Sequence, residues 1–157
     1  MKKILFIFVF ILIYSCANDD DFLSSIPTVS NVNYDSINEV QISTYLTENN
    51  LTAEKTASGL YHMITEEGDG ENPTSTSNVT LAYKGYFFNG DIFDQSENAT
   101  FDLDRLIPGF SEGARLLKEG GSGTFILPSR LAYGNTGSGS IAPGDVILFD
   151  IDLIQIN

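Results

Sequence analysis

The chain has 157 residues, 42% of them apolar and 18% charged, a balance that suits one compact domain with short additions. Its formal net charge is −13, from 21 acidic against 8 basic side chains, and no long basic run interrupts the acidic composition. Such a chain repels a phosphate backbone, so we expect no nucleic-acid partner.

The N-terminus has the pattern of an export signal. Two lysines precede an apolar stretch over residues 4–14, which is shorter than the about 20 residues that a bilayer-spanning helix needs. Residues 1–15 are therefore predicted to be a signal peptide. The following Cys16, in the sequence Ile-Tyr-Ser-Cys, resembles the lipidated cysteine of a bacterial lipobox. This implies a lipid anchor to the outer membrane; the alternatives are a secreted protein with one free thiol and a protein whose hydrophobic N-terminal segment is left uncut.

Residues 16–35 are predicted to form an acidic tether. Asp19, Asp20 and Asp21 follow the cysteine closely, and a Ser/Asn-rich stretch without a clear period comes next. An acidic run in this place resembles the surface-export signal of lipoproteins in Bacteroidetes-type bacteria. Two locations stay open: the cell surface and the periplasmic face of the outer membrane.

The segment 36–57 is predicted to begin with one amphipathic helix over residues 36–50. Ser36 is the expected N-cap, because Glu39 three residues later completes a capping-box pattern. The expected apolar face consists of four side chains at helical spacing, Ile37, Val40, Ile42 and Tyr45.

From residue 58 the apolar pattern changes to period two, which is typical of antiparallel strands with one face on a core and one in water. Three stretches carry this pattern, residues 58–68, 78–88 and 146–156, and a fourth strand is expected at residues 123–128, which are short and apolar. In the stretch 146–156, the expected core side chains are Ile147, Phe149, Ile151 and Leu153. Ile154 and Ile156 make the opposite face apolar, so this strand is expected to end covered on both sides.

A single helix is predicted to interrupt the strands, over residues 107–121. Phe110, Ala114 and Leu117 share one face of it, and Gly120 with Gly121 is expected to end it. A sheet covered by one helix indicates an α+β domain over residues 58–157.

Five separated motifs in this region resemble the FKBP-type peptidyl-prolyl cis-trans isomerases in order and spacing. They are Tyr83-Lys84-Gly85, Gly90-Asp91-Ile92-Phe93-Asp94, Leu106-Ile107-Pro108-Gly109-Phe110, Ala132-Tyr133-Gly134 and Ile147-Leu148-Phe149-Asp150-Ile151-Asp152-Leu153. The resemblance implies an antiparallel sheet wrapped around a short helix, with an aromatic-lined pocket between them. Residues 134–140 would then form a glycine-rich flap beside that pocket.

The resemblance also implies which side chains form the site. The expected catalytic residues are Tyr83, Phe93, Asp94, Tyr133 and Phe149, and the expected proline-binding residues are Leu106, Ile107, Phe110 and Ile141. Phe110 stands where the family has a Trp, and the chain contains no Trp. We therefore expect a deeper pocket floor and weaker activity or altered ligand binding.

The implied reaction requires neither a proton nor a nucleophile, so no cofactor and no metal is expected. Rotation about an X-Pro bond is opposed by about 18–20 kcal/mol of lost amide resonance, which a dry pocket fitted to the twisted amide lowers. The expected partners are proline-containing polypeptides. His62, the only histidine, is interpreted as structural.

Three functions follow as hypotheses. The first is an active prolyl isomerase tethered outside the cytoplasm, assisting the folding of exported proteins. The second is a binding module that uses the same pocket with little turnover. The third is a structural lipoprotein of an envelope assembly.

Overall fold

The structure is a computed structural model that describes residues 32–157. The expected signal peptide 1–15, the expected lipidation site Cys16 and most of the acidic tether lie outside the described residues. Across residues 32–157, no helix has both the length and the apolar character needed to cross a bilayer.

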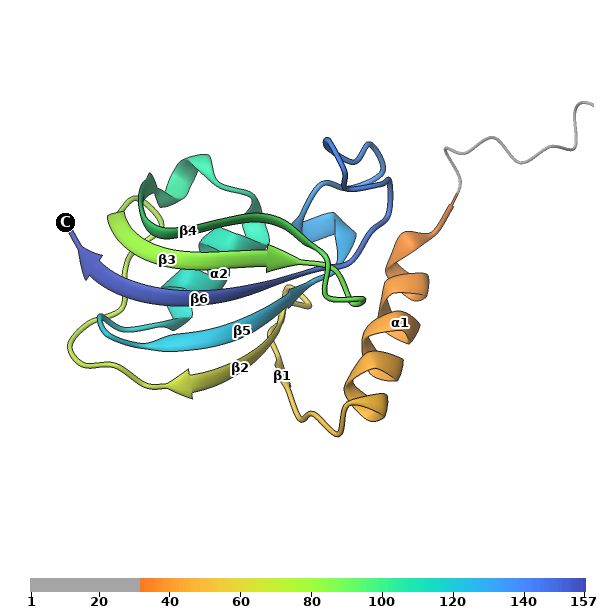
Figure 1. Ribbon diagram of the computed structural model, residues 1–157, viewed down its shortest axis with the longest axis horizontal. Helices are drawn as coiled ribbons and strands as arrows, with labels where there is room; N and C mark the ends of the chain where they lie inside the picture. Colours follow the sequence, from red (N-terminus) through yellow and green to blue (C-terminus); the bar gives the residue numbers. More distant parts are fainter. Residues whose placement is uncertain (1–31) are drawn as a thin grey trace, which may run out of the picture. The chain divides into compact units, whose positions relative to one another are not determined.

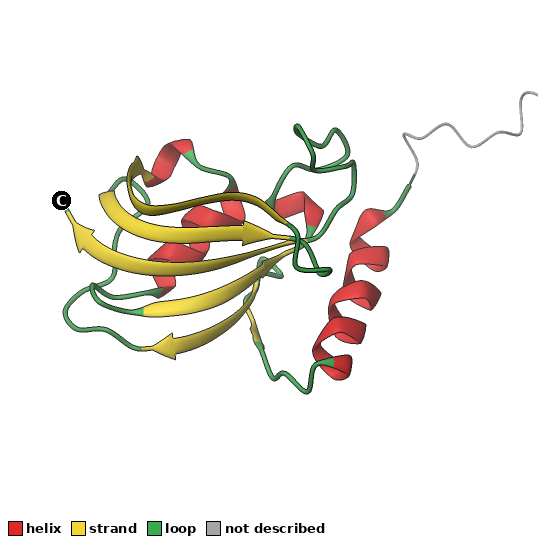
Figure 2. Cartoon of the chain, in the orientation of Figure 1, coloured by secondary structure: helices red, strands yellow, loops and turns green. Residues whose placement is uncertain are grey.

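A curved antiparallel sheet carries the fold, with α2 against one face (Figures 1 and 2). The elements are α1 (Tyr34–Glu48), β1 (Glu54–Lys55), β2 (Tyr61–Glu66), β3 (Asn78–Tyr86), β4 (Ile92–Asp102), η3 (Leu103–Arg105), α2 (Pro108–Leu116), β5 (Ser122–Leu127), η4 (Ser129–Leu131) and β6 (Ile147–Ile156). The six strands follow the order β1-β2-β5-β6-β3-β4, and every neighbouring pair is antiparallel. The predicted α+β class, with a sheet around a short helix and a preceding N-terminal helix, is confirmed.

The main core lies between the sheet and α2. The expected core face of β6 and the expected face of α2 are both buried there, together with Val79 and Leu81 of β3. Gly113 lets α2 approach the sheet closely, because a Cβ atom at this position would lie 2.8 Å from the ring of Phe125. The period-two pattern thus predicted the inward face of the central strands correctly.

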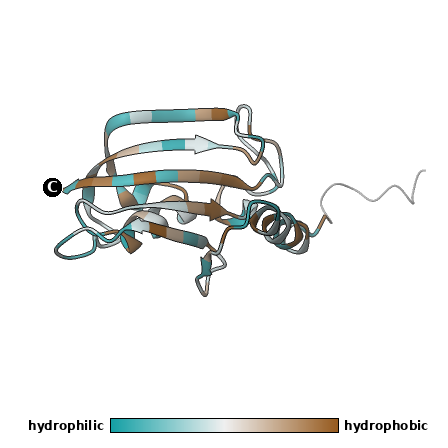
Figure 3. Cartoon of the chain, turned by 60° about the horizontal axis from the view of Figure 1, so that its bottom comes forward, coloured by the Kyte–Doolittle hydropathy of each residue, from teal (hydrophilic) through white to brown (hydrophobic). Residues whose placement is uncertain are grey.

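The opposite face of the sheet is not left entirely to water. Helix α1 lies across one end of it, and Ile42 of α1 packs into a second buried cluster with Tyr61, Ile126, Val146 and Leu148. In Figure 3 the strand that leads to the C-terminus is brown at its end nearest α1, away from the C-terminus itself. The expectation that this face is solvated is therefore wrong beneath α1.

Helix α1 differs from its prediction at both its start and its buried face. It begins at Tyr34 with Asn33 as N-cap, whose side chain accepts a hydrogen bond from the Ser36 N–H, so the expected cap at Ser36 is wrong. Ile37 and Val40 are 45% and 65% exposed. Asn38 and Ile42, four residues apart, are fully buried instead.

Helix α2 ends earlier than predicted. Its last residue is Leu116, because Leu117 takes an extended conformation with ψ 153°. Gly120, with φ +78°, turns the chain toward β5 instead of ending the helix.

The end of β6 also differs from its prediction. The register between β3 and β6 shifts, so that Leu81 pairs with Leu153 and Val79 pairs with Ile156. The extra residue returns Ile156 to the side of the main core and leaves Ile154 47% exposed. The expectation that both faces are covered here is wrong.

Candidate functional site

A hollow of about 250 Å³ opens between α2 and the concave face of the sheet. Its lining side chains come from β3, β4, η3, α2, β6 and the two connecting segments after η3 and η4. They are Tyr83, Asp94, Phe101, Arg105, Leu106, Ile107, Phe110, Tyr133 and Phe149.

The structure brings together seven of the nine expected site residues around this hollow. Phe93 does not line it; its ring lies edge-on against the ring of Phe149, with 5.6 Å between centroids. Ile141 does not line it either; its side chain packs in the main core and is 7% exposed.

Two lining residues, Phe101 and Arg105, were missed by the sequence analysis. Phe101 pairs with Val79 across β3 and β4 and so shares its inward face, a pairing that the structure reveals and the sequence pattern alone does not. Arg105 carries the only basic side chain among the lining residues, and its Nε lies 3.6 Å from Oδ2 of Asp102. Nothing in the period of the sequence indicates that it borders the hollow.

The floor of the hollow is aromatic and built on the first turn of α2. Pro108 suits the first helical position, and Phe110 follows it, only 4% exposed. The Phe110 ring meets Phe149 edge-on at 4.8 Å and Tyr83 edge-on at 5.7 Å, the geometry that aromatic rings prefer. The floor is therefore closely packed and apolar.

One polar pair stands at the rim of this aromatic floor. The Tyr83 hydroxyl donates a hydrogen bond to Oδ2 of Asp94 over 2.7 Å. Burial, and then the hydrogen bond and charge of Asp94, raise the pKa of Tyr83 to about 12. The phenol therefore stays protonated well into the alkaline range, where it continues to donate to the Asp94 carboxylate.

The absence of a side chain at Gly85 leaves room for the rings of Phe93 and Phe149. Gly85 of β3 pairs with Asp94, and a Cβ atom on Gly85 would lie 2.6 Å from the Phe93 ring and 2.7 Å from the Phe149 ring. A larger residue at position 85 would therefore push these rings out of place.

The glycine-rich segment after Tyr133 is held by its own backbone. The Gly137 N–H donates to the Tyr133 carbonyl over 3.2 Å, and Ser138 and Ile141 exchange two hydrogen bonds of 2.8 and 2.9 Å. The Gly144 N–H donates to the Gly134 carbonyl over 2.9 Å and closes the base of the loop. The expected flap is a short hairpin with internal hydrogen bonds, which presents Tyr133 to the hollow.

The only histidine of the chain lies away from the hollow. His62 lies on β2 and is absent from the lining, with its Nε2 3.6 Å from Oε2 of Glu54. Among residues 32–157, no group of three or more His, Cys, Asp or Glu side chains is arranged to hold a metal ion. The aromatic and aliphatic side chains that line the hollow suit an apolar ring.

Comparison with known proteins gives a consistent picture. The family model of the FKBP-type peptidyl-prolyl cis-trans isomerases matches residues 69–154, more than half of the chain. A probable isomerase of this type, FkpA of Neisseria meningitidis, is 45% identical over 106 residues, which are 64% of this chain and 39% of that protein. The chain thus spans about two fifths of the length of this curated relative.

Solved structures show the same similarity. The crystal structure of FkpA from Escherichia coli superimposes with a TM-score of 0.70 and 32% identity, over 78% of this chain and 60% of that chain. A peptidyl-prolyl cis-trans isomerase from Pseudomonas syringae pv. tomato gives a TM-score of 0.68 and 27% identity, over 78% of this chain and 95% of that chain.

Proposed function

The chain belongs to the FKBP-type peptidyl-prolyl cis-trans isomerases, and on this premise we propose that it catalyses cis-trans isomerisation of X-Pro bonds in polypeptides. The observation that carries the proposal is the aromatic hollow with the Tyr83–Asp94 pair at its rim.

The proline ring of the substrate would sit on Phe110 between Tyr83 and Phe149. A planar amide is strongly dipolar, whereas the twisted amide of the transition state has lost its resonance. An apolar box therefore destabilises the ground state relative to the twisted state, and each 1.4 kcal/mol gained in this way gives about a tenfold rate.

Polar groups at the rim would orient the peptide. Ile107 is the N-cap of α2, so its N–H lies outside the hydrogen-bond ladder of the helix and is placed to donate to a substrate carbonyl. The Tyr133 hydroxyl would donate to a second carbonyl. Asp94 would fix the Tyr83 ring and face the carbonyl carbon as its bond twists.

We further propose that the protein acts in the cell envelope on exported polypeptides that contain proline. Support comes from the sequence of the first 21 residues, with its apolar stretch, Cys16 and acidic run. Lipidation of Cys16 would anchor the protein to the outer membrane, facing either the periplasm or the exterior.

A second candidate function is a binding module with little turnover. Phe110, in place of the family's Trp, favours it, because the smaller ring covers less of a bound proline.

A protease-coupled assay of a proline-containing tetrapeptide tests the proposal on the full chain. We expect acceleration that falls about tenfold or more in Tyr83→Ala and in Asp94→Ala. Tyr86→Ala is the matched control, because it makes the same change on the same strand but against the second buried cluster. This variant should keep its activity, provided that a cooperative thermal unfolding transition shows it to be folded. A folded wild-type chain that gives no acceleration would move the assignment to the binding module.

A further inference from the structure

A buried amide side chain outside the hollow connects α1 to the rest of the domain. Asn38 is 0% exposed. Its Nδ2 donates to the Gly144 carbonyl over 2.8 Å and to Oε1 of Gln41 over 3.0 Å, and its Oδ1 accepts from the Ser129 N–H over 2.8 Å. Both amide protons and the carbonyl oxygen are therefore used.

The two backbone partners of Asn38 stand at the two ends of one loop. Ser129 begins η4, which leads into Tyr133, and Gly144 follows the hairpin and precedes β6. Gly144 also closes the base of that loop through its hydrogen bond to Gly134. A single side chain from a helix 91 and 106 residues away in sequence thus ties both ends of the segment that carries Tyr133.

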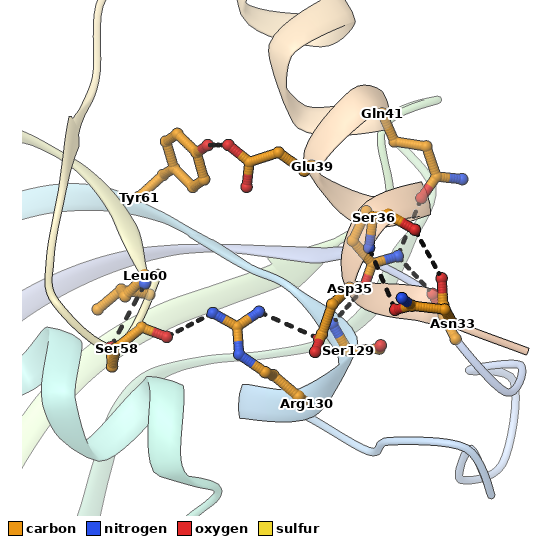
Figure 4. Close-up of polar contacts among 12 residues, drawn as sticks. Asn33, Asp35, Ser36, Glu39, Gln41, Ser58, Leu60, Tyr61, Ser129 and Arg130 are labelled. Carbon is orange, nitrogen blue, oxygen red and sulfur yellow. Dashed lines mark hydrogen bonds and ion pairs between the residues drawn. The ribbon is translucent and has the colours of Figure 1, made fainter.

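Other contacts of α1 reach the same segment. Arg130 of η4 lies between Asp35 of α1, at 3.3 Å, and the Ser58 carbonyl (Figure 4). The Tyr34 ring covers Gly144 so closely that a Cβ atom there would collide with it. Helix α1 therefore holds the loop from outside at several points.

We propose that Asn38 is a positioning residue of the site. By fixing Ser129 and Gly144 together, it sets the base of the loop 129–144, called here the clamped loop, and so holds Tyr133 at the rim of the hollow. Release of α1 from the domain loosens the clamped loop and weakens the grip on the substrate. The effect on activity rests on the proposed function, whereas the effect on the loop does not.

Amide hydrogen exchange of the full chain, resolved by residue, tests the clamp without reference to activity. The Ser129 N–H donates to the Asn38 side chain, so its protection reports on the docking of α1. In the wild type we expect the Ser129 amide to open together with the backbone amides of Asn38 and Ile42. A Ser129 amide that exchanges orders of magnitude faster than those of α1 would overturn the clamp.

Asn38→Leu keeps much of the side-chain volume and removes both hydrogen bonds to the loop. We expect exchange at Ser129, Ser138 and Gly144 to accelerate about tenfold or more beyond any change in the β5 and β6 amides. Ile42→Val is the matched control, because Ile42 is also fully buried on α1 but packs in the second cluster. Equal acceleration of the clamped loop in both variants would reduce Asn38 to a general stabiliser of the helix.

The activity measurement is a separate readout. Asn38→Leu should lower kcat/KM for a proline tetrapeptide roughly tenfold, mostly through a higher KM, while Ile42→Val stays within about twofold of the wild type. A wild type without turnover refutes the proposed function and leaves the exchange result standing. Normal kinetics in Asn38→Leu despite a loosened loop would refute the positioning role.

Discussion

Tyr83 donates a hydrogen bond to Asp94 over 2.7 Å at the rim of the hollow, and the same strand repeats this pairing on its other face. Three residues later, Tyr86 donates to Oδ1 of Asp150 over 2.9 Å, and its ring packs against the second buried cluster. Side chains three residues apart on a strand point to opposite faces. The Tyr83–Asp94 pair therefore lies at the hollow, and the Tyr86–Asp150 pair on the other face is a control for experiments on it.

Asp94→Asn should lower the pKa of Tyr83 from about 12 without returning it to 10.0. Burial is the largest cause of the raised pKa and persists, whereas the hydrogen bond to a carboxylate and its charge are lost. NMR titration of the tyrosine Cζ resonances measures the change, and the Tyr86 resonance should not move. A Tyr83 pKa that stays at about 12 in Asp94→Asn would show that Asp94 has no part in it.

The raised pKa of Tyr83 also determines how the free energy of unfolding should change at alkaline pH. The protonated phenol is favoured in the folded state, so its contribution is complete below pH 10.0 and is lost as pH rises through about 12. Tyr83→Phe should therefore show a shallower loss of the free energy of unfolding over this window than the wild type. Denaturant unfolding at a series of alkaline pH values checks this, and parallel curves would contradict it.

Phe110→Trp should improve the grip on proline. The rings of Tyr83, Phe101 and Phe149 surround Phe110, so the larger indole can extend only into the hollow of about 250 Å³. We expect kcat/KM to rise roughly threefold to tenfold, with a stability change within about 1–3 kcal/mol.

The new indole is also a probe, because the chain has no other Trp. Its emission should shift when a proline peptide binds. Phe88→Trp is the control, since Phe88 stacks on Tyr45 of α1, with 4.5 Å between ring centroids, and does not line the hollow. A peptide-induced shift in both variants, or in neither, would count against the hollow as the proline site.

Gly137→Ala should disrupt the hairpin of the clamped loop. Gly137 has φ +68°, and a Cβ atom there would collide with the Ile141 carbonyl. We expect a loss of the Ser138–Ile141 hydrogen bonds and a fall in kcat/KM of about tenfold, because Tyr133 is displaced. Amide exchange at Ser138 and Ile141 measures the first effect.

Gly139→Ala is the matched control for this change. Gly139 has φ +57° but open space around its Cβ position, so only the backbone strain of about 1 kcal/mol remains. Its kcat/KM should stay near that of the wild type. Similar kinetic losses in both variants would assign the effect to the left-handed backbone instead of to the Ile141 contact.

The sequence pattern predicted the sheet well because alternation directly reports which face of a strand is dry. Val79, Leu81 and Phe149 needed only their period to be placed in the core. Alternation reports the face of a side chain but not its depth. The pattern therefore could not show that Phe101 lines the hollow whereas Phe93 packs against the ring of Phe149.

The buried face of α1 lay beyond the sequence pattern for a different reason. An apolar count favours Ile37 and Val40, yet Asn38 is buried, because its partners are backbone groups of a distant loop. Only the three-dimensional arrangement reveals such a partner. The loop's own hydrogen bonds were hidden in the same way, since a run of glycines looks flexible in sequence.

The contacts between α1 and the strands β1 and β2 should weaken in acid, because Glu39 of α1 joins these elements through its carboxylate. Its carboxylate accepts hydrogen bonds from Lys55 Nζ at 2.7 and 2.8 Å and from the Tyr61 hydroxyl, and these bonds lower its pKa below 4.5, with Lys55 the larger cause. A lowered pKa means that the contribution is present above pH 4.5 and is lost as pH falls through the folded-state value. The stability advantage of the wild type over Glu39→Gln, under about 1 kcal/mol for so exposed a pair, should therefore shrink in acid.

Lys55→Met should likewise reduce the dependence of the free energy of unfolding on pH in the acid range. Adding Lys55→Met to Glu39→Gln should change the free energy of unfolding little further, as expected for partners in one interaction. Additive losses from the two substitutions, measured by denaturant unfolding at about pH 6, would show that the two side chains act independently.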